Sequence, residues 1–258
     1  MATSGTSSFN ATRNEIIRQA AYMVMAVRLG GRMGADIVDV FDHRLNAMIK
    51  HWQGKGIHVW TVTEGTLFPQ PETVQYALSN AASSAHATQS YSSTTLSADE
   101  ASGQTVLSIT AAIGASGNYI GIVLDDGTIH WSTISGTPGT TVTIVDALTG
   151  SASSGNKVFS YSAKIVRPLK VVAARSYDID SGNETPLTPM SRQEYRDLPN
   201  KTATGAYNQF FYDPQLTTGQ FYIWQPRTTA DQLINFTWHR PIQDFTASGD
   251  NPDLPQEW

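Results

Sequence analysis

Apolar side chains recur at helical spacing over the first part of the chain. Thr12 and Glu15 fit a capping box that opens a helix, and an apolar stripe follows it until Gly30-Gly31. A second apolar stripe predicts a longer helix from about Asp36 to Gly54. Alternating residues after this helix predict two strands, at 57–62 and 73–78.

The middle of the chain has a different pattern. Residues 81–93 are almost all Ala, Ser and Thr, which is typical of a linker. Short β-rich runs separated by turns follow, and Asp126-Gly127 between two of these runs predicts a hairpin with a type I′ turn. Five or six strands in about 70 residues predict a small antiparallel barrel or sandwich.

The last third returns to mixed structure. Residues 164–172 predict a strand that re-enters the parent domain, and Ser191 with Glu194 forms a second capping box before a short helix. Three further strands are expected, at 209–212, 220–224 and 233–238. Residues 253–258 resemble the start of another helix, so we expect the native chain to continue past Trp258.

These patterns predict an α+β fold in three parts. Residues 1–80 form the N-terminal part of a helical body with a strand, residues 81–163 form an inserted all-β module, and residues 164–258 return to the body. The charge supports this division, because the three parts carry net charges of +1, −4 and −2, and the middle part has only one basic residue, Lys157.

Composition excludes several classes of protein. The chain has 258 residues, no cysteine, a formal charge of −5 and only 15% charged residues, against roughly 25% in an ordinary soluble domain. Without cysteine there are no disulfides, thiolate metal sites or cysteine nucleophiles. Mild acidity argues against a general nucleic-acid binder, and no apolar run is long enough to span a membrane.

Candidate chemistry is sparse. His43 and His51 lie eight residues apart on one predicted helix, too far to chelate one ion, and the turn accounts for Asp126. No nucleophile elbow, phosphate-binding loop or dinucleotide fingerprint occurs. We therefore predict no enzymatic activity, no cofactor and no metal site.

Aromatic residues gather between positions 207 and 224. Alternation along two strands would bury half of them, and the other half would lie in a covered interface, in a sugar-binding platform or on a plain outer face. On the long helix, three polar residues lie off the apolar stripe and face either solvent or a partner. The candidate interface residues are Arg44, Lys50, His51, Tyr207, Phe211, Tyr222 and Trp224.

Four segments carry a resemblance to a known family. They are the helix–turn–strand segment 45–60, the hairpin 121–131, the pair 192–195 and 222–226, and the final segment 251–258. In this order they resemble the head-to-tail adaptor proteins of short-tailed bacteriophages, which are also called head-completion or packaged-DNA-stabilisation proteins.

The resemblance implies a structural virion protein with a helical adaptor body. Such a protein forms a ring, usually of twelve copies, below the portal protein in the neck between head and tail. There it extends the DNA channel, retains the packaged genome and docks the tail. It binds the portal, its own neighbours and the tail nozzle or tube protein, and packaged DNA passes through its lumen without sequence-specific contact. It would be made in the host cytoplasm, and a further helix would follow residue 258. The β-insert departs from the simplest all-helical adaptors. The alternatives are a tail-associated carbohydrate-binding or adhesion module and a cell-wall hydrolase.

Overall fold

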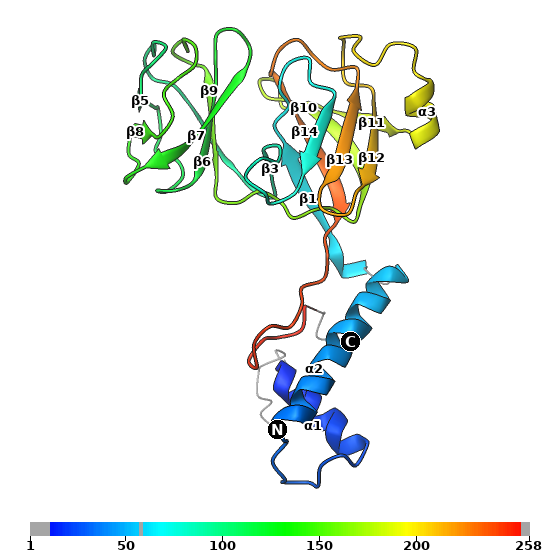
Figure 1. The fold of residues 1–258 in the computed structure, drawn as a ribbon. Coiled ribbons are helices and arrows are strands. Elements are labelled where there is room, and N and C mark those ends of the chain that lie inside the picture. Colours follow the sequence, from blue (N-terminus) through cyan, green and yellow to red (C-terminus); the bar gives the residue numbers. More distant parts are fainter. Residues whose placement is uncertain (1–10, 57–58, 254–258) are drawn as a thin grey trace, which may run out of the picture. The chain divides into compact units, whose positions relative to one another are not determined.

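The computed structural model describes residues 11–56 and 59–253, and β-strands dominate it (Figure 1). The chain divides into two compact units. We call residues 1–62 with 241–258 the helical unit and residues 63–240 the β unit. The expected helix start at 253–258 lies almost wholly outside the described residues.

The prediction of a helical body is wrong. Only 16% of the chain is helical, and the structure is mostly two large curled sheets of eight and six strands. The eight-stranded sheet combines strands from residues 62–88 with strands from residues 170–239, on both sides of the six-stranded sheet in the sequence. These long-range strand pairings leave no mark in local periodicity.

The helical unit contains two α-helices in its described part, namely α1 (Arg13–Met23) and α2 (Ala35–Gly54). The carboxylate of Glu15 accepts a hydrogen bond from the Thr12 backbone N–H at 2.8 Å, as the predicted capping box requires. Helix α1 ends well before the predicted stop at Gly30-Gly31, because the apolar side chains that follow it have no core to pack against. The strand predicted at 57–62 is wrong over residues 59–61, which form a short 3₁₀ turn, η1 (Val59–Thr61). Residues 57–58 lie outside the described residues, and Val62 begins strand β1 (Val62–Leu67).

The segment after residue 240 completes the small core of the helical unit. Ile49, Ile242 and Phe245 are buried together, and Leu45 packs against them. The side-chain amide of Asn46 fixes this segment, since it donates to the Phe245 carbonyl at 3.1 Å and accepts from the Phe245 N–H at 3.0 Å.

The eight-stranded sheet has the order β2-β13-β12-β11-β10-β14-β1-β3. Strands β11 and β12 pair in parallel, whereas β10 runs antiparallel to β11 and β14. A short helix, α3 (Arg192–Asp197), begins at the predicted Ser191 capping box and connects toward β12. The strands are β1 (Val62–Leu67), β2 (Gln75–Leu78), β3 (Ala87–Thr88), β10 (Lys170–Asp178), β11 (Glu184–Pro189), β12 (Gln209–Pro214), β13 (Gly219–Trp224) and β14 (Gln232–His239).

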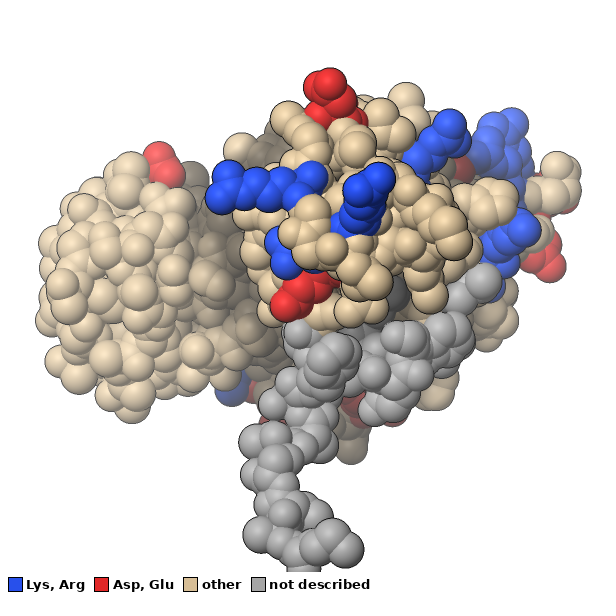
Figure 2. All heavy atoms as spheres, turned by 90° about the horizontal axis from the view of Figure 1, so that it is seen from below, with Lys and Arg blue, Asp and Glu red and all other residues tan. Residues whose placement is uncertain are grey.

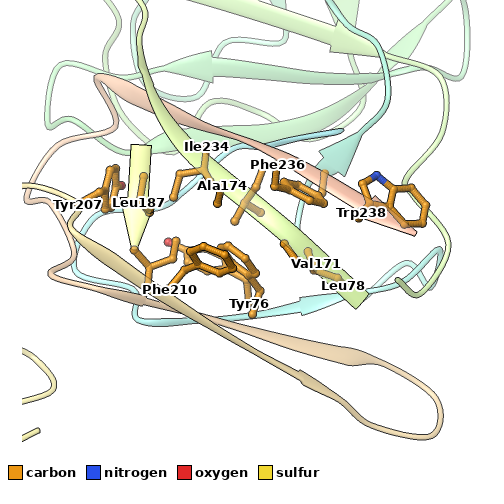
Figure 3. Close-up of a cluster of buried hydrophobic side chains, with 14 of the residues drawn as sticks. Tyr76, Leu78, Val171, Ala174, Leu187, Tyr207, Phe210, Ile234, Phe236 and Trp238 are labelled. Carbon is orange, nitrogen blue, oxygen red and sulfur yellow. The ribbon is translucent and has the colours of Figure 1, made fainter. Parts of the chain in front are cut away.

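The inner face of this sheet encloses one apolar core (Figure 3). Alternation along the strands directs every second side chain inward, as for Phe221 and Ile223 on β13 and Ile234, Phe236 and Trp238 on β14. All five are at most 1% exposed, so the core is continuous across the curled sheet.

The six-stranded sheet has the order β4-β9-β6-β7-β8-β5. An antiparallel bridge between Leu96 and Ile109 joins the two edge strands, so the sheet closes on itself; we call it the barrel. Its centre is aliphatic, with Ile120, Ile122, Val142 and Val158 among the fully buried side chains. The strands are β4 (Ser92–Thr95), β5 (Val106–Ser108), β6 (Tyr119–Val123), β7 (Ile129–Ser135), β8 (Thr141–Ile144) and β9 (Lys157–Tyr161).

The barrel lies within the range predicted for an inserted module, although the predicted linker at 81–93 already contains strand β3 and the start of β4. The face of the barrel shown at the left of Figure 2 is almost free of Lys and Arg, in line with its single lysine. The predicted hairpin joins β6 to β7, where Asp126 accepts from the Thr128 N–H at 2.8 Å and Gly127 has a φ of 83°. The predicted type I′ turn is wrong, because that turn needs a positive φ at both central residues and Asp126 does not have one. Hydrogen bonds from Thr128 hold the pKa of Asp126 below its usual value. These contacts explain Asp126 as a turn residue.

Candidate interaction surfaces

An exposed apolar segment follows helix α1. Met23, Val24, Met25 and Leu29 are 85%, 64%, 90% and 90% exposed; we call this the apolar loop. Single exposed apolar side chains are common on protein surfaces, but several in one short segment usually indicate a contact site. No motif predicted this loop, because the sequence pattern places Met23 and Val24 on the apolar stripe of a longer helix.

The three candidate residues on α2 have different surroundings. Arg44 and His51 are exposed. The Lys50 ammonium group lies 2.7 Å from a carboxylate oxygen of Asp244 and donates to the Ile242 carbonyl at 3.1 Å. Lys50 therefore joins α2 to the segment that follows residue 240 in the same chain.

The aromatic candidates lie on opposite faces of their sheet. Tyr207 is buried in the eight-stranded core. Phe211 and Tyr222 lie on the outer face and stack with each other at 5.5 Å between ring centroids. Tyr195 of α3 covers them, with centroid distances of 5.9 Å to Phe211 and 4.8 Å to Tyr222.

The remaining aromatic candidate, Trp224, also has a partner within the chain. Its indole N–H donates to the Asn200 carbonyl at 2.9 Å, in the segment that follows α3. Helix α3 and this segment thus cover part of the outer aromatic face from within the same chain.

A second aromatic group joins the barrel to the eight-stranded sheet, and no sequence pattern predicted it. His86 stacks on Trp131 with ring centroids 3.9 Å apart and an interplanar angle of 6°. Its Nδ1 lies 2.6 Å from the Tyr161 hydroxyl. Phe68 is buried beside the same two aromatic rings, at 5.2 Å from Trp131 and 5.9 Å from Tyr161. We call these four residues the junction cluster.

Burial governs the electrostatics of the junction cluster. Desolvation, together with the nearby charge of Lys164, lowers the pKa of His86 to about 3, so the imidazole is neutral at physiological pH. Desolvation also raises the pKa of the Tyr161 hydroxyl, which keeps its proton. A neutral imidazole can accept that proton in a hydrogen bond at Nδ1. The cluster therefore packs the two sheets together without a buried charge on the histidine.

Lys164 has a structural role next to this cluster. Its side chain is 7% exposed, and its ammonium group donates to the backbone carbonyls of Ser84 and, at 2.8 Å, of Ala82. Burial lowers its pKa. These bonds hold the loop at residues 79–86 against Lys164. We therefore assign Lys164 a structural role and not a catalytic one.

The described part of the chain has neither a group of metal ligands nor a membrane-spanning helix. Within residues 11–56 and 59–253, no three His, Asp or Glu side chains are grouped so that they could hold a metal ion. No helix in those ranges is long and apolar enough to cross a membrane. The chain matches no protein-family model, no curated protein and no solved structure.

Proposed function

We propose that the chain is a structural subunit of a virion neck, a β-rich head-to-tail adaptor that assembles as a ring below the portal and docks the tail. The observation that carries this proposal is the apolar loop, in which Met23, Met25 and Leu29 are at least 85% exposed. The sequence resemblance described above supplies the class of assembly.

The small core of the helical unit supports an assembly role. Among the described residues of this unit, Ile49, Ile242 and Phe245 form the buried cluster, and the other buried apolar residues are Ile17 and Ala21. Small cores stabilise a fold weakly, because the buried fraction of the surface falls with size. Complete burial of a Met or Leu side chain contributes about 1.5–3 kcal/mol. Burying the apolar loop against a neighbouring subunit would therefore add considerably to the stability of this unit.

The charge of the chain suits contact with other proteins and passage of DNA. A formal charge of −5 and 15% charged residues leave wide neutral surfaces. A strongly basic lumen would retain DNA through counterion release, whereas a neutral or acidic one lets it pass. A ring of this composition below the portal would extend a DNA channel and retain the genome without binding its phosphates tightly.

The test is recruitment by the portal protein of the same virus. We expect the isolated chain to sediment as a monomer or weak oligomer, and to form a ring on the purified portal in velocity sedimentation and negative-stain electron microscopy. The double variant Met25→Ser/Leu29→Ser should bind the portal at least tenfold more weakly than the unaltered chain. Leu216→Ser is the matched control, because Leu216 is 92% exposed on the β12–β13 turn. Failure of the portal to recruit the unaltered chain would overturn the proposal.

A further inference from the structure

A hollow of about 230 Å³ opens at one end of the barrel. It lies where strands β4 and β6 begin and β9 ends, since its walls come from residues 90–92, Gly114, Asn118 and residues 160–162. All of these segments belong to the barrel or its immediate flanks, so the hollow is a property of this module. It is distinct from the apolar loop and from the outer aromatic face.

The lining is polar but uncharged. It consists of serine hydroxyls, two tyrosines, one asparagine amide and a glycine, without Lys, Arg, His, Asp or Glu. Within the described part of the chain, the side chains of Ser90, Ser92, Asn118 and Ser162 and the Tyr91 hydroxyl make no hydrogen bond to another protein group. They can supply both donors and acceptors to a ligand, because hydroxyl and amide groups do both.

Tyr91 adds an oriented aromatic surface to these polar groups. Its ring meets Phe68 edge-on at 5.3 Å and 80°, and Phe159 at 5.9 Å and 76°. These contacts fix the ring while the residue stays partly exposed. A sugar ring needs an apolar surface for its C–H face and hydrogen-bonding groups for its hydroxyls. The Tyr91 ring and the neighbouring free hydroxyls supply both.

The wall opposite strand β9 depends on a glycine. Gly114 has a φ of 73°, and a Cβ atom there would lie 2.3 Å from the Ser160 hydroxyl oxygen. Only glycine allows the loop to approach β9 this closely. The hollow is therefore formed in the unliganded fold, so binding costs little ordering of the protein.

We propose that this hollow binds one ring of a neutral saccharide. Its uncharged lining gives no partner to a phosphate, a carboxylate or an ammonium group, whereas its hydroxyl and amide groups match a polyhydroxylated ligand. Its volume lies just below the usual range of ligand sites, about 300–1,000 Å³, which fits a single sugar ring. The proposal is independent of assembly at a portal.

The test is a titration of the whole ¹⁵N-labelled chain followed by NMR. The probes are glucose, galactose, mannose and N-acetylglucosamine, and short oligosaccharides of each, with inorganic phosphate as the charged comparison. We expect at least one neutral sugar to give saturable shifts at the amides of Ser92, Asn118 and Ser162. The double variant Asn118→Ala/Ser162→Ala should bind that sugar roughly tenfold more weakly, because it loses two hydrogen-bonding groups.

A matched control is available on the same loop. Ser116 is exposed and does not line the hollow, so Ser116→Ala should bind like the unaltered chain. Ser162→Trp, a change at an exposed position on the rim, should abolish binding by filling the hollow and tests the site even if the double variant fails to fold. Absence of saturable shifts with every neutral sugar, shifts unaffected by these variants, or tighter binding of phosphate would each overturn the proposal.

Discussion

The junction cluster makes the stability of the β unit dependent on pH. His86 is neutral in the folded chain because its pKa is about 3, whereas in the unfolded chain it takes the ordinary value of 6.5. Below pH 6.5 the unfolded state therefore binds a proton that the folded state does not, and the free energy of unfolding falls as pH falls. This contribution is fully present above pH 6.5 and is lost progressively down to pH 3.

The size of the effect follows from the two pKa values of His86. Between pH 7 and pH 5, protonation of the unfolded state removes about 2 kcal/mol of stability, of which about 0.7 kcal/mol is lost by pH 6. The folded state binds almost no proton in this range, so any folded pKa below about 4 gives the same loss. A loss of this size is a large fraction of the stability of a typical domain.

The assay is urea unfolding at pH 7, 6 and 5 at constant ionic strength, followed by tryptophan fluorescence and circular dichroism. His86→Phe retains an aromatic ring against Trp131 but cannot titrate. We expect it to be less stable than the unaltered chain at pH 7 by about 1 kcal/mol, because it loses the hydrogen bond to Tyr161. Between pH 7 and 5, His86→Phe should lose about 2 kcal/mol less unfolding free energy than the unaltered chain does.

A histidine elsewhere in the chain provides the control for this experiment. His43 lies on α2 with its side chain 81% exposed, so His43→Gln should leave the pH dependence of the β unit unchanged. If His86→Phe loses as much stability between pH 7 and 5 as the unaltered chain does, His86 is not the source of the pH dependence.

Three further substitutions test other contacts. Gln70→Ala should destabilise the β unit by about 1–3 kcal/mol in urea unfolding, because its amide donates to the Ile129 carbonyl at 2.8 Å and accepts from the Ile129 N–H at 3.1 Å. Asn46→Ala removes both hydrogen bonds to Phe245 and should speed hydrogen exchange across residues 242–248 severalfold. Gly114→Ala should lower the thermal midpoint of the barrel by several degrees, because the new Cβ overlaps Ser160 and the φ of 73° disfavours alanine.

Each of these substitutions has a control at a comparable position. Gln75→Ala breaks only an exposed pair with Gln220, and Arg44→Ala changes an exposed side chain on α2. Gly117→Ala has a similar φ of 84° but open space around the new Cβ, so it measures backbone strain alone. Equal effects of a substitution and its control would contradict the contact assigned to that residue.

Local sequence signals predicted individual elements well. The capping boxes at Thr12 and Ser191 open helices, and the Asp126 turn joins two strands, because each depends on residues within a few positions of one another. Strand β11 escaped prediction because its sequence, Glu-Thr-Pro-Leu-Thr-Pro, contains two prolines, and β4 because Ser-Ser-Thr-Thr is typical of a linker.

The assembly of these elements depended on distant partners. Strand β14 pairs with β10 and adjoins β1, and β13 pairs with β2 more than a hundred residues earlier in the chain. No local periodicity encodes such pairings, so a body that is mostly sheet was mistaken for a helical one. The same limit applies to the candidate residues, since Lys50 and its partner Asp244 are 194 positions apart in the sequence.

The path of the chain into and out of the barrel has a consequence for its evolution and engineering. Strands β4 and β9, the first and last of the barrel, pair with each other, and the Thr88 hydroxyl donates to the Ala163 carbonyl at 3.0 Å just outside them. Entry and exit are therefore neighbours, which is the geometry that lets one domain be inserted into another. Residues 89–162 could be gained, lost or exchanged as a cassette by joining two adjacent backbone ends. Such an exchange would uncover Phe68 and His86, so those two positions would have to change with the cassette.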